Sequence, residues 1–301
     1  HYSFVVNDHA FSPRLGAAWY IPAADLVLRF SYDRVFETPA IENLLLASSP
    51  EVTQLEPEAL RIPVPPSRGN YFETGFSKGI FKTARLDVSF YRRAFNNFAD
   101  DDVFLNTGIG FPIAFASAQV RGVDVKLDLP RWGKLSGFLS YSNMLGVAQL
   151  PVVGGLFLGG DAEGVLAATT SFPISQDQRN TARAHARYQI TPRIWAALSV
   201  EYGSGLPVEL ANDVDIAFLE AQYGPRIVSR VNFAAGRVRP NFSLDANAGA
   251  ELWHREKSSL NLEIAAENLT NQLNLIDFAG LFSGNAIEPP RSATVRLRYK
   301  F

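Results

Sequence analysis

Hydrophobic and polar residues alternate along most of this chain with a period of two. The last eleven residues, 291–301, place Ala, Val, Leu, Tyr and Phe on one face and Ser, Thr, Arg and Lys on the other. A two-faced pattern of this kind is typical of a β-strand, and no stretch of comparable length has a helical period. The pattern predicts eleven strands, at 12–21, 25–35, 69–80, 85–97, 117–129, 134–146, 182–190, 194–203, 242–251, 260–267 and 291–301.

The connections between these strands alternate strictly between short and long. The short ones fall at 22–25, 81–84, 130–133, 191–193 and 254–258, and the long ones at roughly 36–68, 98–116, 147–180, 204–238 and 271–290. An antiparallel meander would then carry every short turn on one edge and every long loop on the other. That asymmetry is typical of an outer-membrane β-barrel, with periplasmic turns and external loops. We therefore expect an all-β, antiparallel transmembrane barrel with apolar side chains toward lipid and polar ones toward a wet or plugged interior.

The tryptophans give an independent indication. Trp19, Trp132, Trp195 and Trp253 all lie at or beside short turns. Amphipathic rings prefer the membrane interface, so we expect these four residues to form part of a periplasmic aromatic girdle. Tyr32, Tyr141 and Tyr202 fall near the opposite strand ends, as an outer girdle requires. The alternative is that the aromatic residues anchor the turns of a soluble β-sheet.

The charge and cysteine content of the chain exclude several classes of function. The chain has 28 Lys and Arg against 30 Asp and Glu, so its net charge of -2 gives no reason to expect nucleic-acid binding. With no cysteine, it has no disulfide, thiolate metal site or cysteine nucleophile. Eleven strands are an odd number, which is exceptional for a closed barrel. We therefore expect an incomplete barrel that belongs to a longer protein.

Short motifs recur in order along these strands. They are Phe11–Gly16, Ser31–Asp33 with Phe36–Pro39 and Glu42–Leu44, Tyr71–Gly75, Val120–Asp124, Glu267–Asn271 and Pro290–Phe301. Together they resemble the C-terminal half of the barrel of TonB-dependent outer-membrane receptors. The run from Asp100 to Pro112 is most similar to the subgroup that carries an N-terminal carboxypeptidase-regulatory-like domain.

The resemblance implies a barrel of 22 strands. Residues 1–301 would be its C-terminal portion, and the plug and the N-terminal regions would lie outside this chain. It further implies location in the outer membrane, contact with lipid, and engagement of the TonB complex through the missing N-terminal region. The implied activity is uptake of a scarce small ligand: a siderophore, cobalamin, an oligosaccharide or a peptide. The ligand-binding residues stay unknown, because in the family they lie in variable loops and on the plug.

The C-terminal strand carries a motif that suggests how the barrel is recognised during assembly. In outer-membrane barrels, a terminal aromatic residue preceded by apolar residues at every second position resembles the signal read by the barrel-assembly machinery. We expect Val295, Leu297, Tyr299 and Phe301 to be assembly determinants as well as lipid-facing residues.

Candidate sites for other chemistry are weak. Asn96, Asn97 and Asp100–Asp102 could offer oxygen ligands to Ca²⁺, but the cluster lacks the spacing and glycine of a calcium loop, which favours a solvated acidic loop. Thr38, Pro39 and the apolar run to Leu46 predict a capped helical turn. The histidines His1, His9, His185 and His254 are scattered, and His185 is expected to be a hydrated residue of the barrel interior.

No nucleophile elbow, phosphate-binding loop or dinucleotide motif occurs, so neither an enzyme nor a cofactor is predicted. Three alternatives to an active transporter stay open: a passive porin, an outer-membrane enzyme with its catalytic groups at the barrel rim, and a structural or adhesive barrel.

Overall fold

The period-two segments form strands that pair in the order in which they occur along the chain. The computed structural model describes residues 2–3, 8–38, 60–81, 83–103, 110–158, 170–208, 215–255, 258–280 and 284–301. Its main sheet runs β19-β16-β15-β12-β11-β9-β8-β7-β6-β4-β3, with every neighbouring pair antiparallel. The bounds are Arg14–Ile21 for β3, Leu26–Glu37 for β4, Ser67–Ile80 for β6, Ala84–Val103 for β7, Gly110–Trp132 for β8, Leu135–Leu158 for β9, Asn180–Thr191 for β11, Ile194–Gly203 for β12, Asn241–Arg255 for β15, Ser258–Glu267 for β16 and Ser292–Lys300 for β19. The eleven predicted strands and their meander are confirmed.

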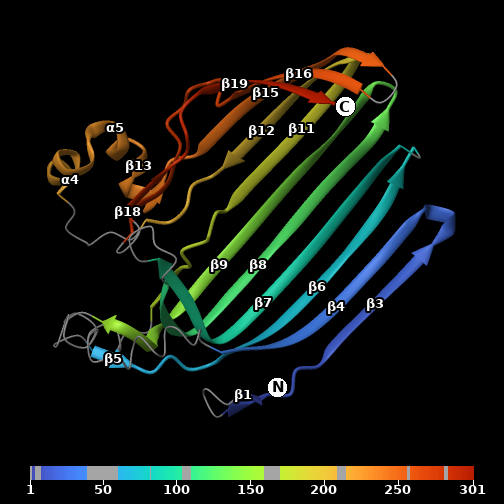
Figure 1. Cartoon of the computed structure of the whole chain (residues 1–301). Coiled ribbons are helices and arrows are strands. Elements are labelled where there is room, and N and C mark those ends of the chain that lie inside the picture. Colours follow the sequence, from blue (N-terminus) through green and yellow to red (C-terminus); the bar gives the residue numbers. More distant parts are fainter. Residues whose placement is uncertain are drawn as a thin grey trace.

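The sheet is strongly curved and open (Figure 1). Its first strand, β3, and its last, β19, lie at opposite edges and do not pair with each other. The short turns lie at the right of the view, and the described parts of the long connections, with α4, α5, β13 and β18, lie at the left. The sorting of loops by length is therefore also confirmed.

Three strands extend far into segments that were predicted to be long loops. Strand β7 extends to Val103, β8 begins at Gly110 and β9 extends to Leu158, so parts of the loops expected at 98–116 and 147–180 belong to the sheet. The ladder continues there through pairs such as Asp100 with Ile113. Near these extensions Phe98, Ala148 and Ile174 belong to a buried apolar cluster, and the added residues of β8 and β9 are mainly apolar, so the two-faced pattern that marks the other strands is lost.

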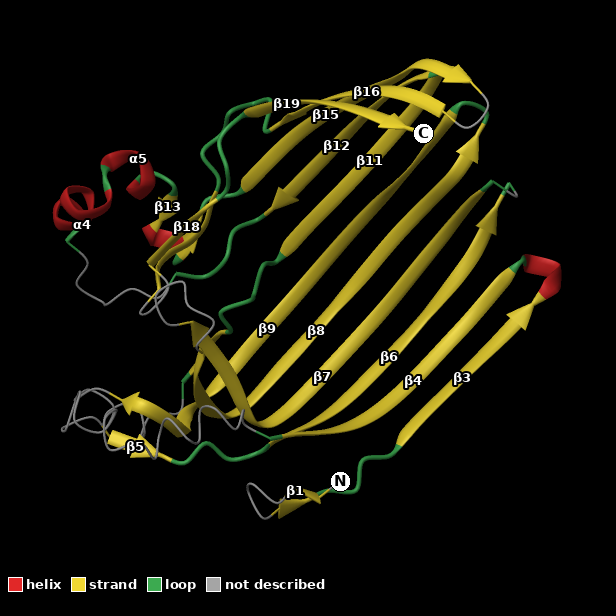
Figure 2. Cartoon of the chain, viewed as in Figure 1, coloured by secondary structure: helices red, strands yellow, loops and turns green. Residues whose placement is uncertain are grey.

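Short strands and helices lie at the end of the sheet that carries the long loops (Figure 2). They are β1 (Tyr2–Ser3), β2 (Asp8–His9), β5 (Leu60–Ile62), β10 (Ser171–Pro173), α4 (Ile216–Tyr223), α5 (Pro225–Val228), β13 (Val231–Asn232), η2 (Phe233–Ala235), β14 (Arg237–Val238), β17 (Leu275–Gly280) and β18 (Gly284–Ile287). The short helix η1 (Pro22–Ala24) lies at the other end, in the turn between β3 and β4. The helical turn expected at 39–46 lies outside the described residues.

Two of the long connections share an apolar core. Its fully buried members, Val228, Val231, Val238, Leu275 and Phe278, come from the segment between β12 and β15 and from the β17–β18 hairpin. We call the described parts of these two connections, residues 204–208, 215–240, 268–280 and 284–291, the loop layer. The layer therefore packs around its own core, and hydrogen bonds such as that from Asn274 Nδ2 to the Phe242 carbonyl oxygen, at 3.0 Å, join it to the sheet.

None of the helices in the described parts of the chain is long and apolar enough to cross a bilayer.

Candidate functional site

The two faces of the sheet differ in chemistry. One face carries cross-strand ion pairs: Arg29 Nη1 to Asp87 Oδ1 at 3.3 Å, Arg183 Nε to Glu201 Oε1 at 3.6 Å and Arg296 Nη1 to Glu263 Oε2 at 3.9 Å. Arg183 with Glu201 and Glu263 with Arg296 are direct cross-strand partners, whereas Arg29 of β4 reaches across β6 to Asp87 of β7. We call this the inner face, since residues of β7 to β15 on it border one common cavity.

The opposite, outer face is apolar and exposed. Phe30, Phe90, Leu198, Ile264 and Leu297 all point outward, and their exposed fractions lie between 48% and 63%. A band of large apolar side chains of this extent marks a surface that contacts another apolar medium. The assignment of Leu262 to the outer face and Glu263 to the inner face follows from their register with Leu297 and Arg296.

A cavity of about 710 Å³ lies against the inner face. Its wall is formed by polar and charged side chains of the sheet: Asp87, Ser89, Asp124, Lys126, Ser140, Ser142, Thr181, Arg183, Glu201 and Ser243. Its roof is formed by the loop layer and by the segment before β11, through Gln178, Leu206, Ile276 and Glu288. A cavity of this volume suits a small molecule, and carboxylates and cations both line it.

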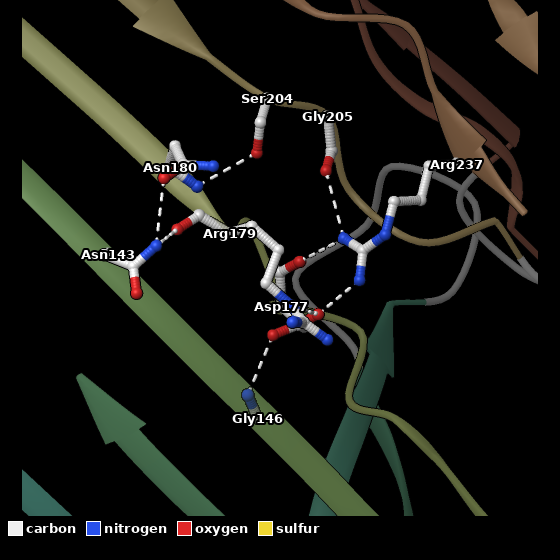
Figure 3. A network of polar contacts seen from close by, with 8 residues as sticks. All are labelled: Asn143, Gly146, Asp177, Arg179, Asn180, Ser204, Gly205 and Arg237. Carbon is white, nitrogen blue, oxygen red and sulfur yellow. Dashed lines mark hydrogen bonds and ion pairs between the residues drawn. The ribbon is translucent and has the colours of Figure 1, made fainter. Parts of the chain in front are cut away.

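A network of polar contacts fixes the roof to the wall (Figure 3). The Asp177 carboxylate accepts hydrogen bonds from the Gly146 backbone N–H at 2.8 Å and from Arg179 Nε at 2.8 Å, and it pairs with Arg237 Nη2. The Arg237 guanidinium also donates to the carbonyl oxygens of Asp177 and Gly205. One carboxylate thereby joins β9, the start of β11 and the loop layer.

Burial and charge act in opposite directions on Asp177. Its side chain is fully buried, and burial alone would raise its pKa. The hydrogen bonds from Arg179, from the Gly146 N–H and from Arg237 outweigh burial, so the pKa of Asp177 is lowered from 3.8. The carboxylate is therefore ionised under ordinary conditions. The alternation pattern gave no signal for this residue, because Asp177 lies outside the strands.

Aromatic rings and cations lie together on the inner face beside the cavity. The Arg93 guanidinium lies 5.5 Å from the ring centroid of Tyr71 and 5.3 Å from that of Tyr91. Tyr71 also meets Phe95 edge to face at 5.3 Å. These contacts are attractive and fix the rings, so they give the wall a second kind of surface for ligand contact.

The predicted tryptophans do not all face the same way. Trp19 pairs with outer-face Leu28, and Trp253 stacks on Tyr299 at 6.2 Å. Trp132 lies opposite Leu135 and is 66% exposed. Trp195 instead lies on the inner face, where the Arg187 guanidinium sits 4.1 Å from its ring centroid. Trp195, which was expected to belong to the periplasmic aromatic girdle, points inward because its strand places odd-numbered residues on the inner face.

The other predicted residues are placed as follows. Val295, Leu297, Tyr299 and Phe301 are exposed, and β19, which carries the first three, is an edge strand. His185 lies on the inner face, with Nδ1 2.9 Å from Ser199 Oγ. Asn97 Nδ2 donates to the Pro66 carbonyl, whereas Asp100 accepts from Ser175. Asp100 was expected in a loop but belongs to β7.

The described residues contain no group of three or more His, Asp or Glu arranged to hold a metal ion. His9 and His254 lie in separate strands, and His1 lies outside the described residues.

Comparisons with known proteins agree with this architecture. The family profile described as TonB dependent receptor-like, beta-barrel matches residues 1–269. No curated protein sequence matches the chain.

Several solved structures share the fold. The ferric enterobactin receptor PfeA mutant from Pseudomonas aeruginosa has a TM-score of 0.61 and 15% identity, with 99% of this chain and 41% of that chain covered. The ferric-catecholate import receptor Fiu from E. coli K12 has a TM-score of 0.60 and 12% identity, with 95% and 34% covered. The outer membrane transporter YddB from Escherichia coli has a TM-score of 0.62 and 10% identity, with 100% and 42% covered.

The chain thus spans between 34% and 42% of the length of these three solved structures. The profile match covers most of the sequence, and the inner wall, the apolar outer band and the sorted loops give it a physical basis. The chain belongs to the TonB-dependent receptor β-barrel family of the outer membrane.

Proposed function

We propose that residues 1–301 form the C-terminal portion of the barrel of a receptor that takes up a scarce ligand by TonB-coupled transport. The observation that carries this proposal is the cavity of about 710 Å³ between the inner wall and the loop layer. A passive pore requires an open path, whereas a receptor requires a walled site with convergent polar groups. The plug and the segment that engages TonB would be supplied by parts of the protein outside this chain.

Among the ligand classes expected from the sequence, we favour a metal chelate of the siderophore type. The names of solved relatives include a ferric-catecholate import receptor, a ferric citrate transporter and a ferripyoverdine receptor. The inner wall offers cations and aromatic rings, as in the contact of Arg93 with Tyr71 and Tyr91. Anionic chelates with aromatic groups suit such a surface.

Uptake by cells tests this proposal. The full reading frame would be expressed in strains with and without TonB and given radiolabelled ferric catecholates, ferric citrate and cobalamin. We expect saturable uptake of one chelate, abolished without TonB. Uptake that does not depend on TonB, with steady ion conductance of the purified protein in a planar bilayer, would establish the passive porin instead.

A matched pair of variants tests the site itself. Ser140 lines the cavity, and Ser136 lies on the same face of β9 but does not border it. We expect Ser140→Trp in the full receptor to weaken ligand binding about tenfold by filling the cavity. Ser136→Trp should leave binding unchanged. Equal binding by both variants would place the ligand elsewhere.

A further inference from the structure

Three arginines interrupt the apolar outer face at the end that carries the long loops. Arg34 lies on β4 two residues after Tyr32, Arg92 lies on β7 two residues after Phe90, and Arg121 lies on β8 two residues before Val123. Alternation along a strand places each arginine on the same face as its apolar neighbour. All three are exposed. We call Arg34, Arg92 and Arg121 the outer arginine cluster.

The strand register brings two of these charges together. Arg92 and Arg121 are direct cross-strand partners in the β7–β8 ladder. Side chains in such a pair stand about 5 Å apart at their Cβ atoms, and like charges in this position repel. The third, Arg34, is opposite Asn70 on the neighbouring strand. An arrangement that repels itself needs a counter-charge.

No counter-charge comes from the described part of this chain. None of the three arginines makes an ion pair there, whereas inner-face arginines such as Arg29 and Arg183 do. The outward neighbours Asn70 and Asn143 are neutral. An anion in the medium that touches the outer face would therefore compensate these charges.

The position of the cluster identifies that medium. On β7 and β8, the outward residues on the turn side of Arg92 and Arg121 are apolar, from Phe90 and Val123 to Leu86 and Leu127. Tyr32 lies at the same level, because it pairs with Phe72 and Phe72 pairs with Arg92. Aromatic residues mark the boundary between hydrocarbon and headgroups. The arginines therefore lie at the headgroup level of the leaflet on the loop side.

We propose that the outer arginine cluster binds the phosphate groups of anionic lipid in the external leaflet of the outer membrane. The guanidinium groups can each donate two parallel hydrogen bonds to a phosphate, and one phosphate between Arg92 and Arg121 would remove their mutual repulsion. This site faces lipid, so it is separate from the ligand cavity of the inner face. The inference depends on the membrane orientation of the barrel and not on the identity of the transported ligand.

Binding of a purified lipid to the full-length receptor tests the proposal. The receptor would be held in neutral detergent, and retention of diphosphoryl lipid A would be followed by native mass spectrometry. We expect the double variant Arg92→Gln/Arg121→Gln to bind this lipid about tenfold more weakly than the wild type. The control Arg296→Gln/Arg298→Gln removes the same charge from the inner face and should bind as the wild type does. Arg34→Gln provides a milder variant should the double variant fail to fold.

Two further probes separate the sources of phosphate. A lipid A from which the phosphates have been removed should bind the wild type and the double variant equally weakly. Inorganic phosphate at equal concentration should not displace the lipid. Equal lipid affinity of the wild type and both arginine variants, or displacement by inorganic phosphate, would overturn the proposal.

Discussion

The Asp177 carboxylate and the Arg237 guanidinium lie in direct contact although 60 residues separate them in the sequence. The Asp177 side chain has no exposed surface, and that of Arg237 is 18% exposed. Asp177 precedes β11, and Arg237 begins β14 in the loop layer. Because Asp177 also accepts from the Gly146 N–H of β9, this ion pair joins the β14 part of the loop layer to the wall of the sheet.

Removal of the Asp177 carboxylate should release the loop layer. Asp177→Ala leaves the Arg237 guanidinium largely buried without its partner, and such changes destabilise by about 3 kcal/mol. We expect hydrogen exchange at 204–208 and 231–238 to accelerate while exchange in the strands stays unchanged. The control is Glu220→Gln, which removes an exposed carboxylate from the loop-layer helix α4. Equal protection in both variants would contradict this role.

The same network predicts a pH dependence. The pKa of Asp177 is lowered in the folded protein from 3.8, so its carboxylate stabilises the loop layer above that pH. This stabilisation is lost as the pH falls through the lower, folded value. We expect protection of 231–238, corrected for intrinsic exchange, to stay level between about pH 7 and pH 5 and to fall below about pH 4. Asp177→Asn should abolish this acid-dependent step, and its persistence would assign the step to another group.

The ring of Trp195 lies so close to the backbone of Gly249 that a side chain there would collide with it. A Cβ atom at this position would lie 2.5 Å from the Trp195 ring, which packs under the Arg187 guanidinium. Gly249→Ala must displace that ring, and we expect a loss of about 1–3 kcal/mol in the free energy of unfolding. Gly16→Ala is the matched control, because a Cβ there would meet only the Phe30 carbonyl oxygen, at 3.9 Å. Denaturant unfolding of the full receptor in micelles measures both, and equal stability would show that the ring moves freely.

The two faces of β16 predict opposite responses to the same charge. Leu262 pairs with Leu297 on the outer face, whereas Glu263 lies on the inner face near Arg296. Leu262→Arg places a cation in lipid and should destabilise the full barrel by about 2–4 kcal/mol. Glu263→Arg should cost far less, because water reaches the inner face. Unfolding in phospholipid vesicles measures the difference, and equal tolerance would contradict the assigned facing.

Much of the sheet was predictable, because a membrane-facing strand must be apolar on one side. This constraint made the alternation visible in 182–190 and 260–267, and the order and facing of these strands are confirmed. The requirement for one apolar face weakens beyond the apolar band, so the Asp-rich end of β7 was expected to be a loop. The facing of Trp195 was also missed, because proximity to a turn does not determine the parity of a residue on its strand.

The cavity and its roof could not be predicted from the alternation. Asp177 and Arg237 lie in different long connections, and only the folded loop layer brings them together. The apolar core that contains Val238 and Phe278 likewise joins short segments without a regular period. These features depend on contacts between distant loops, for which a single sequence carries no pattern.

The C-terminal aromatic residue should affect assembly more than stability. Phe301 is 97% exposed, and its ring lies 6.1 Å from that of Tyr299, so its removal costs little packing. Strand β19 is an edge strand of the sheet, and we expect Phe301 to be read when that edge is extended by strand addition during assembly. Phe301→Ala should lower the amount of folded full receptor in the outer membrane several-fold, measured by heat-dependent gel mobility, while the purified barrel unfolds as the wild type does. Lys300→Ala, which faces inward, should assemble normally. A normal amount of folded Phe301→Ala receptor in the outer membrane would contradict the assembly role and show that Phe301 is only a lipid contact.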